Sequence, residues 1–212
     1  MLKKISRVVS VGLLLTVSCV SAGAEQDSSA SALRDTLAAT TSLSGEFQQT
    51  LRDSEHKAIE TSSGDFVLQR PGRFFWHTQK PFEQQLISDG TTIWLYDPDL
   101  MQVTVRPVDA SAKATPAVLL SESVESLAKA FRITRSVGQG GHQVFGLTPI
   151  NDDSLFAKLE LEFAEQQLLR IVVHDSLGQT TEFALTDTQR NRPVDAALFT
   201  FTAPDGVDVL ID

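Results

Sequence analysis

The sequence contains a single cysteine, Cys19, which lies in the N-terminal leader described below. The rest of the chain has no thiol, which excludes disulfides, thiol catalysis and thiolate metal sites there. The four histidines, His56, His77, His142 and His174, are scattered without the short spacing of a metal-binding motif. The chain also lacks a glycine-rich phosphate loop and a nucleophile-elbow motif. We therefore expect no catalytic residue, no metal site and no cofactor.

Basic residues are scarce relative to acidic ones. The chain has 18 lysines and arginines against 27 aspartates and glutamates, and three of the basic residues but none of the acidic ones lie in residues 1–24. Residues 25–212 therefore carry 15 basic and 27 acidic side chains, a net charge of −12. This balance argues against nucleic acid as a partner and against nonspecific docking on anionic lipid surfaces.

The N-terminus has the pattern of an export signal. A basic start (Lys3, Lys4 and Arg7) precedes the apolar residues 8–20, a stretch shorter than the ~20 residues that span a bilayer as a helix. Ala22-Gly23-Ala24 then supplies the small-x-small pattern that signal peptidase cleaves. We expect residues 1–24 to be a signal peptide cleaved near Ala24. Removing these 24 of the 212 residues leaves 188, a length that suits one domain, residues 25–212.

Most of the remaining chain alternates apolar and polar residues with a period of two. Phe66 and Leu68, for example, share a face opposite Asp65 and Val67, and the pattern recurs at 47–51, 159–163, 169–173, 181–185 and 199–202. Turn signals such as Asp97-Pro98-Asp99 and the residues 89–90, 138–141 and 177–178 separate these segments. Such alternation is typical of strands with one apolar face. It predicts one long antiparallel sheet of about ten strands.

Two regions have helical spacing instead. Leu33 and Leu37 follow Ser28-Ser29, either of which suits a helix N-cap, and a second helical region runs from about residue 115 to 131. About three short helices are thus the available cover for a sheet that must curl. Either the sheet encloses a filled core, or an apolar cavity remains beneath the helices. Pattern alone favours the filled core, because most one-sided sheets are simply cores.

Two stretches of sequence resemble a known family. The first comprises GDFVLQRPGRFFW at residues 64–76 and ISDGTTIWLYDP at residues 87–98, and the second is VDAALFTFTAPDGV at residues 194–207. With the order helix, sheet, helix, sheet, these stretches resemble LolA, the outer-membrane lipoprotein carrier family. The resemblance covers essentially the whole chain after the leader.

The resemblance implies a fold and a function. The fold is an incomplete antiparallel β-barrel covered by a lid of helices, with an apolar cavity between them. The function is to accept acylated lipoproteins from an inner-membrane ABC transporter and deliver them to an outer-membrane receptor. A periplasmic monomer without catalytic activity is expected. A carrier of another amphiphile, such as a glycolipid, and an envelope-stress sensor with the same half-barrel are the alternatives.

Arg70 is the candidate residue for controlling the lid. Pro71 biases Arg70 towards an extended conformation, and the Arg70 guanidinium carries five donors that need acceptors. Free carbonyls at helix ends are suitable acceptors. The resemblance implies that the arginine of this Arg-Pro pair latches the lid shut in the empty state. The alternative is a solvated arginine at a strand end.

The cavity is expected to be lined by aromatic and aliphatic side chains. Phe74 and Trp76 match family positions near the cavity and its rim, and the residues 118–120 match the lid helix. The full predicted set is Phe47, Phe66, Phe74, Trp76, Trp94, Val118, Leu119 and Leu120. Ordinary core packing is the alternative for each of them. Arg73 is expected to add a second cation near the mouth.

Overall fold

The computed structural model describes residues 22–108, 116–121, 124–151 and 156–212. In these residues one sheet of twelve strands has the order β12-β6-β5-β4-β3-β2-β1-β11-β10-β9-β8-β7. Neighbouring strands are antiparallel, except that β12 pairs parallel with β6. The expectation of about ten antiparallel strands was therefore low by two and missed the parallel pair.

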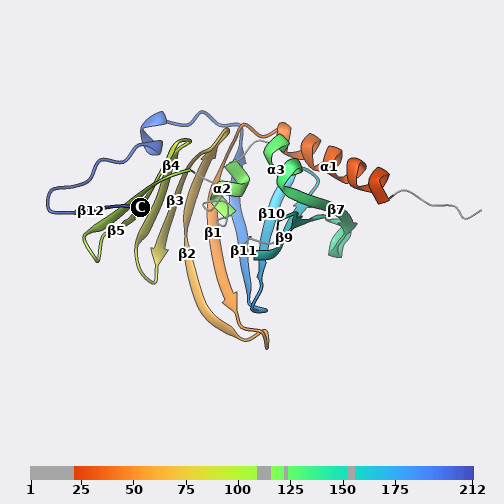
Figure 1. Ribbon diagram of the computed structural model, residues 1–212, viewed down its shortest axis with the longest axis horizontal. Helices are drawn as coiled ribbons and strands as arrows, with labels where there is room; N and C mark the ends of the chain where they lie inside the picture. Colours follow the sequence, from red (N-terminus) through yellow and green to blue (C-terminus); the bar gives the residue numbers. More distant parts are fainter. Residues whose placement is uncertain (1–21, 109–115, 122–123, 152–155) are drawn as a thin grey trace, which may run out of the picture.

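The strands are connected mostly by short hairpins. They are β1 Ser42–Arg52, β2 Ala58–Gln69, β3 Arg73–Lys80, β4 Gln84–Asp89, β5 Thr92–Asp97, β6 Gln102–Pro107, β7 Phe131–Val137, β8 Gln143–Pro149, β9 Phe156–Ala164, β10 Gln167–Asp175, β11 Thr180–Arg190 and β12 Asp208–Ile211. The sheet curls but stays open, with β12 at one edge and β7 at the other in the part of the chain described (Figure 1).

Three α-helices cover the concave side of the sheet. They are α1 Ala22–Ala38, α2 Pro116–Ser121 and α3 Val124–Ala130, and the 3-10 helices η2 Gln139–Gly141 and η3 Ala196–Phe199 lie in connections. Helix α2 contacts β2 and β3, whereas α1 and α3 contact each other and β7 (Figure 1). The predicted fold class, an incomplete antiparallel barrel under a helical lid, is confirmed.

Helix α1 is longer than the sequence pattern indicated. Leu33 and Leu37 are buried one turn apart, as their spacing predicts. The predicted N-cap at Ser28 or Ser29 is wrong, however, because the helix already begins at Ala22 and both serines lie inside it. The preceding alanines, Glu25 and Gln26 are good helix formers, which allows the helix to extend in the N-terminal direction.

The alternating pattern assigned most faces of the sheet correctly but failed in β10. The residues Leu169, Ile171 and Val173 were expected to share the apolar face, yet Leu168 is buried in the core and Leu169 is only partly buried. A bulge between Leu168 and Arg170 shifts the pairing with β9. An extra residue in one strand moves the side chains that precede it to the opposite face.

The predicted strand at 199–202 is also wrong. Phe199 ends the 3-10 helix η3, and residues 200–207 form no ladder. Phe199 is nonetheless fully buried and Phe201 stacks on Tyr96, with ring centroids 5.1 Å apart. The apolar alternation there therefore reflects burial of an extended segment, because such a segment also presents alternate residues to one side.

A glycine shapes the concave face where the site lies. Gly64 in β2 stands opposite Phe47 in β1. A Cβ on residue 64 would lie 1.8 Å from the His77 carbonyl oxygen of β3, so no other residue fits without moving the backbone. Glycine at this position therefore allows the close approach of β2 to β3.

Candidate functional site

Aromatic rings from four strands meet on the concave face. The register of β1, β2 and β3 puts Phe47, Phe66, Phe74 and Trp76 on this face, and all four are buried. The Trp76 ring lies 4.4 Å from Phe47, 5.3 Å from Phe66 and 5.6 Å from Phe183 of β11, measured between centroids. We call Phe47, Phe66, Trp76 and Phe183 the aromatic cluster.

Helix α2 covers this face of the sheet. Its residues Ala117, Val118 and Leu120 are buried in the same apolar core as the aromatic cluster. The side chain of Leu119, which was predicted to line the cavity, lies outside the described part of the structure. Four of the five predicted aromatic residues and two of the three aliphatic ones are thus brought together. The role of each in ligand binding stays a prediction.

Trp94 was predicted to line the cavity, but it lies on the other face of the sheet. Trp94 of β5 pairs with Ile87 of β4, and Ile87 pairs with Phe75 of β3. These three residues face the convex side, whereas Ile93 and Leu95 take the concave side with Phe74 and Trp76. Arg73 shares the face of Phe75 and is therefore not at the mouth of the cavity. The sequence did not reveal that this sheet has an apolar patch on both faces.

The convex patch is covered by the C-terminal segment. Phe199 is the last residue of η3, which contacts β3 and β4, and Phe201 packs on Tyr96 of β5. Ile87 and Val103 are buried there, separately from the main core. The aromatic residues Trp94 and Tyr96 thus form a second, smaller core.

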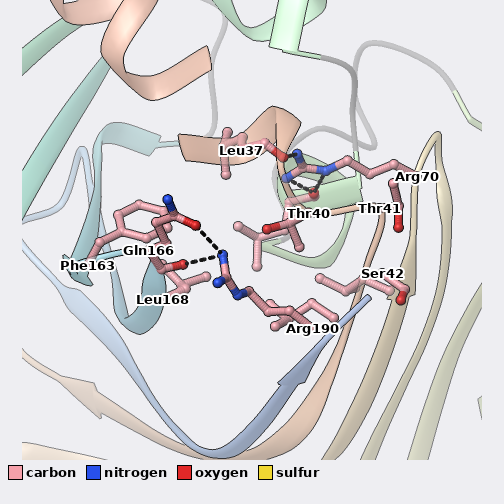
Figure 2. Close-up of a pocket in the computed structure, with 12 residues that line it drawn as sticks. Leu37, Thr40, Thr41, Ser42, Arg70, Phe163, Gln166, Leu168 and Arg190 are labelled. Carbon is pink, nitrogen blue, oxygen red and sulfur yellow. Dashed lines mark hydrogen bonds between the residues drawn. The ribbon is translucent and has the colours of Figure 1, made fainter. Parts of the chain in front are cut away.

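Arg70 joins the sheet to the ends of two lid helices. Its Nη1 donates to the Leu37 carbonyl of α1 at 2.8 Å, and its Nε and Nη2 donate to the Leu120 carbonyl of α2 at 3.0 and 2.8 Å (Figure 2). These carbonyls lie in the last turns of their helices, where the helix itself supplies no donor. The Gly72 amide adds a bond to the Ser121 carbonyl at 2.8 Å.

Burial affects the chemistry of Arg70 as well as its geometry. Loss of solvent lowers the pKa of Arg70 to about 10, because burial disfavours the charged form. The guanidinium nevertheless remains cationic at neutral pH. Its hydrogen bonds are therefore charge-assisted, the stronger class. Pro71, which follows Arg70 in the β2–β3 turn, is exposed and makes no lid contact of its own among the described residues.

The cavity beneath Arg70 is almost filled. It is bordered by apolar residues from α1, α2 and four strands of the sheet, namely Leu37, Leu43, Leu68, Leu120, Phe163 and Leu168 (Figure 2). Its volume is only about 20 Å³, room for about one water molecule. An acyl chain cannot enter unless α1 or α2 moves. The lid is therefore closed over this part of the concave face.

Two polar residues at the end of β11 were missed by the sequence argument. Arg190 lines the same cavity and donates to the Gln166 carbonyl at 3.0 Å (Figure 2). The Asn191 side chain accepts from the Thr41 amide and donates to the Ala39 carbonyl, both at 2.8 Å. Asn191 thereby holds the C-terminal end of α1 on the sheet. The sequence did offer one signal, namely a cationic and an amide side chain next to each other at the end of an apolar strand.

The described residues contain little that suggests other chemistry. They include no group of three or more His, Cys, Asp or Glu side chains suited to a metal ion. Over the same ranges, no helix has the length and apolar character required to cross a bilayer. The convex face of β8–β11 instead carries an ion-pair network in which Glu162 accepts from His142 at 2.8 Å and from Arg170 at 2.7 Å.

Comparisons with known proteins agree with this arrangement. Residues 38–202 match the family model described as "Outer membrane lipoprotein carrier protein LolA". The outer-membrane lipoprotein carrier protein of Chromohalobacter salexigens is 37% identical, over 95% of this chain and 92% of its own. That of Hahella chejuensis is 36% identical, over 98% of both chains.

Solved structures support the fold at lower sequence similarity. A conserved protein from Thermus thermophilus superposes with a TM-score of 0.52 at 15% identity, over 88% of this chain and 99% of its own. MucB superposes with a TM-score of 0.50 at 16% identity, over 83% of this chain and 64% of its own. At such identities the likeness concerns the fold alone.

Proposed function

The chain belongs to the LolA family of outer-membrane lipoprotein carriers, and from this premise we propose that it carries acylated lipoproteins across the periplasm. The observation that carries the proposal is the apolar concave face, which is closed by helices that the single side chain of Arg70 ties down. A filled core would not need a charged side chain to hold its cover in place. A lid that must open and close does.

We propose that the cargo's acyl chains replace the lid on the aromatic cluster. Burial of one methylene is worth ~0.8 kcal/mol, so a full acyl chain offers on the order of 10 kcal/mol. Three chains bound at full strength would not be released. Opening the lid costs part of this energy, since α2 must leave Phe47 and Trp76 and Arg70 must give up its acceptors. The net affinity is then low enough for onward transfer.

The partners follow from the same proposal. Cargo enters from an inner-membrane lipoprotein-releasing ABC transporter, whose ATP hydrolysis gives the process its direction, and leaves to an outer-membrane receptor. The carrier acts as a monomer, without catalysis and without a cofactor. Export fits the N-terminal pattern, in which residues 1–24 are removed. The intact mass of the periplasmic form should then match residues 25–212, and a mass that includes acylated Cys19 would contradict this part.

Displacement of an apolar dye tests the proposed function. An environment-sensitive dye should bind the purified protein and be displaced by a triacylated lipopeptide. The same peptide without acyl chains is the control and should displace nothing. A protein that binds neither dye nor lipopeptide has a filled core and is not a carrier. Displacement by a glycolipid alone would identify a carrier of a different amphiphile.

A further inference from the structure

A second pocket lies at the opposite end of helix α2 from Arg70. It is bordered on the concave face by the apolar side chains of Trp76, Leu86, Leu95 and Phe183, by the polar side chains of Gln49, Thr78 and Gln84, and by Ala117 from the first turn of α2. Its volume is about 250 Å³, more than ten times that of the cavity under Arg70. Trp76 and Phe183 belong to the aromatic cluster, so this pocket leads directly to the surface that α2 covers.

Arg106 of β6 faces into this pocket. Arg106 pairs with Ile93 of β5, Ile93 pairs with Ser88 of β4, and Ser88 pairs with Phe74 of β3. Paired residues lie on the same face of a sheet, so Arg106 is on the concave side with Phe74. The side chain borders the pocket and is partly buried. It makes no hydrogen bond or ion pair with any residue in the ranges that the structure describes. Donors left without acceptors beside apolar residues are costly, which favours an acceptor that arrives with a ligand.

Arg70 and Arg106 therefore differ in state. Arg70 is saturated by the helix carbonyls, and the cavity beside it is closed. Arg106 has free donors in the described structure, and the pocket beside it is open. A ligand can reach Arg106 before the lid moves, whereas it can reach the space under Arg70 only afterwards.

We propose that Arg106 binds the head of the cargo's diacylglyceryl group by donating hydrogen bonds to its ester carbonyl oxygens. The acyl chains then run past Trp76 and Phe183 and displace α2 from the aromatic cluster. This inference rests on the proposed function and names the place where the lipid first binds.

The test compares ester and ether lipids. Wild type, Arg106→Leu and Arg106→Lys are titrated with a fluorescent triacylated lipopeptide and with its dialkyl ether counterpart, which lacks both ester carbonyls. Arg106→Leu should weaken binding of the ester about tenfold or more, the loss expected for a charged hydrogen bond, and change ether binding by less than about twofold. Arg106→Lys should lie between, since it keeps the charge but not the planar fork.

Controls separate this inference from the proposed function. Arg132→Leu removes an exposed arginine from β7 and should bind both lipids like wild type. The melting temperature of Arg106→Leu should stay close to that of wild type, since Arg106 has no partner to lose in the described structure. If Arg106→Leu binds the ester like wild type, or weakens both lipids equally, the inference is overturned while the carrier function stands. If wild type binds neither lipid, the proposed function fails and the inference with it.

Phospholipids carry the same pair of esters and need a separate arm. A short-chain phosphatidylethanolamine is added as a competitor of the ester lipopeptide. Competition that depends on Arg106 supports a site for diacylglyceryl esters in general. Lack of competition, with the ester–ether difference intact, supports a site specific to the lipoprotein. Competition that is unchanged in Arg106→Leu places the esters elsewhere and overturns the inference.

Discussion

Burial of the Arg70 cation costs stability, while its hydrogen bonds hold the lid helices on the sheet. Burial lowers its pKa to about 10, so holding the cation inside the protein costs stability at every pH below that value. Three charge-assisted hydrogen bonds to two carbonyls offset this cost only while both lid helices are in place. Because Arg70 stays charged through the neutral range, we expect the strength of this latch to be the same from about pH 6 to 8.

Arg70→Leu should weaken the closed lid. Loss of one or two charged hydrogen bonds should favour the open lid by about 1.5–3 kcal/mol, a factor of ten or more in population. Cargo should still load but leave poorly, because closing no longer competes with the lipid. Arg70→Lys should be intermediate. A two-step assay measures this effect by scoring release from the inner membrane and then transfer to the receptor.

Arg73→Leu is the matched control for this prediction. Arg73 lies three residues away at the start of β3 but faces the convex side, and it makes no hydrogen bond with the described residues. It should load and transfer like wild type. If Arg70→Leu behaves the same way, the hydrogen bonds of Arg70 do not control the lid, which is then held by packing alone.

Glu162 provides a pH-dependent test on the convex face. Although burial by itself raises it, hydrogen bonds from His142 and Arg170 bring the pKa of Glu162 below its ordinary value of 4.5. A carboxyl with a lowered folded pKa stabilises the protein above its unfolded pKa, and this contribution is lost as the pH falls through the folded value. Glu182, 3.8 Å from Arg170, is the other carboxylate on this network, and Glu160 pairs separately with Lys158.

Glu162→Gln should therefore lower the free energy of unfolding by about 1–2 kcal/mol at pH 7, allowing for the partial exposure of Arg170. The difference from wild type should shrink below about pH 4.5. Urea unfolding at both pH values measures it. Glu55→Gln, an exposed carboxylate in the β1–β2 turn without an ion pair in the described structure, should show no such difference. A deficit that persists undiminished in acid would rule out the ionic explanation.

At the scale of elements, the sequence was informative where local rules determine the outcome. The turn signals located the hairpin turns at residues 89–90, 97–99, 138–141 and 177–178, and the helical spacing of residues 115–131 anticipated α2 and α3. The sequence pattern failed where the pairing between strands determines which face of the sheet a residue occupies. The bulge at Leu168, the convex packing of Phe199 and the start of α1 at Ala22 each depend on a neighbouring strand or on helix continuation that no local period records.

The candidate site was predictable to the same extent. Residues on strands with a clean alternation, such as Phe66 and Phe74, were assigned to the correct face. Trp94 was not, because β5 is apolar on both sides and its pattern has no polar face to set the direction. Arg190, Asn191 and Arg106 were missed because the role of a polar residue at a strand end depends on the helix or pocket that it contacts. The sequence pattern does not show that contact.

The two tryptophans offer a direct test of which face binds lipid. Trp76 lies in the aromatic cluster, whereas Trp94 packs on the convex face. Trp94→Phe should therefore keep the fluorescence change that accompanies lipopeptide binding, and Trp76→Phe should lose it. The two single-tryptophan proteins are titrated under the same conditions. A signal that disappears in Trp94→Phe but survives in Trp76→Phe would place the lipid on the wrong side of the sheet for this account.

At the scale of the whole molecule, the half-open barrel explains how one domain can hold and release an apolar cargo. A fully closed barrel of this size would bury its interior permanently, and an uncovered sheet would expose a large apolar surface to water. The helices cover much of the concave face in this structure, leaving a cavity of about 20 Å³ under Arg70 and a pocket of about 250 Å³ beside Arg106. Binding is then an exchange of one apolar cover for another, and its net free energy is small.

The carrier function is tested most directly by identifying what the protein holds in the cell. Because Arg70→Leu should accept cargo but not release it, this variant is purified from the periplasm. The mass of the intact complex is then measured by native mass spectrometry. We predict a complex of one carrier with one triacylated lipoprotein, more abundant than in wild type or Arg73→Leu. Recovery of the folded variant with a glycolipid or a phospholipid in place of a lipoprotein, or with nothing bound, would contradict the account.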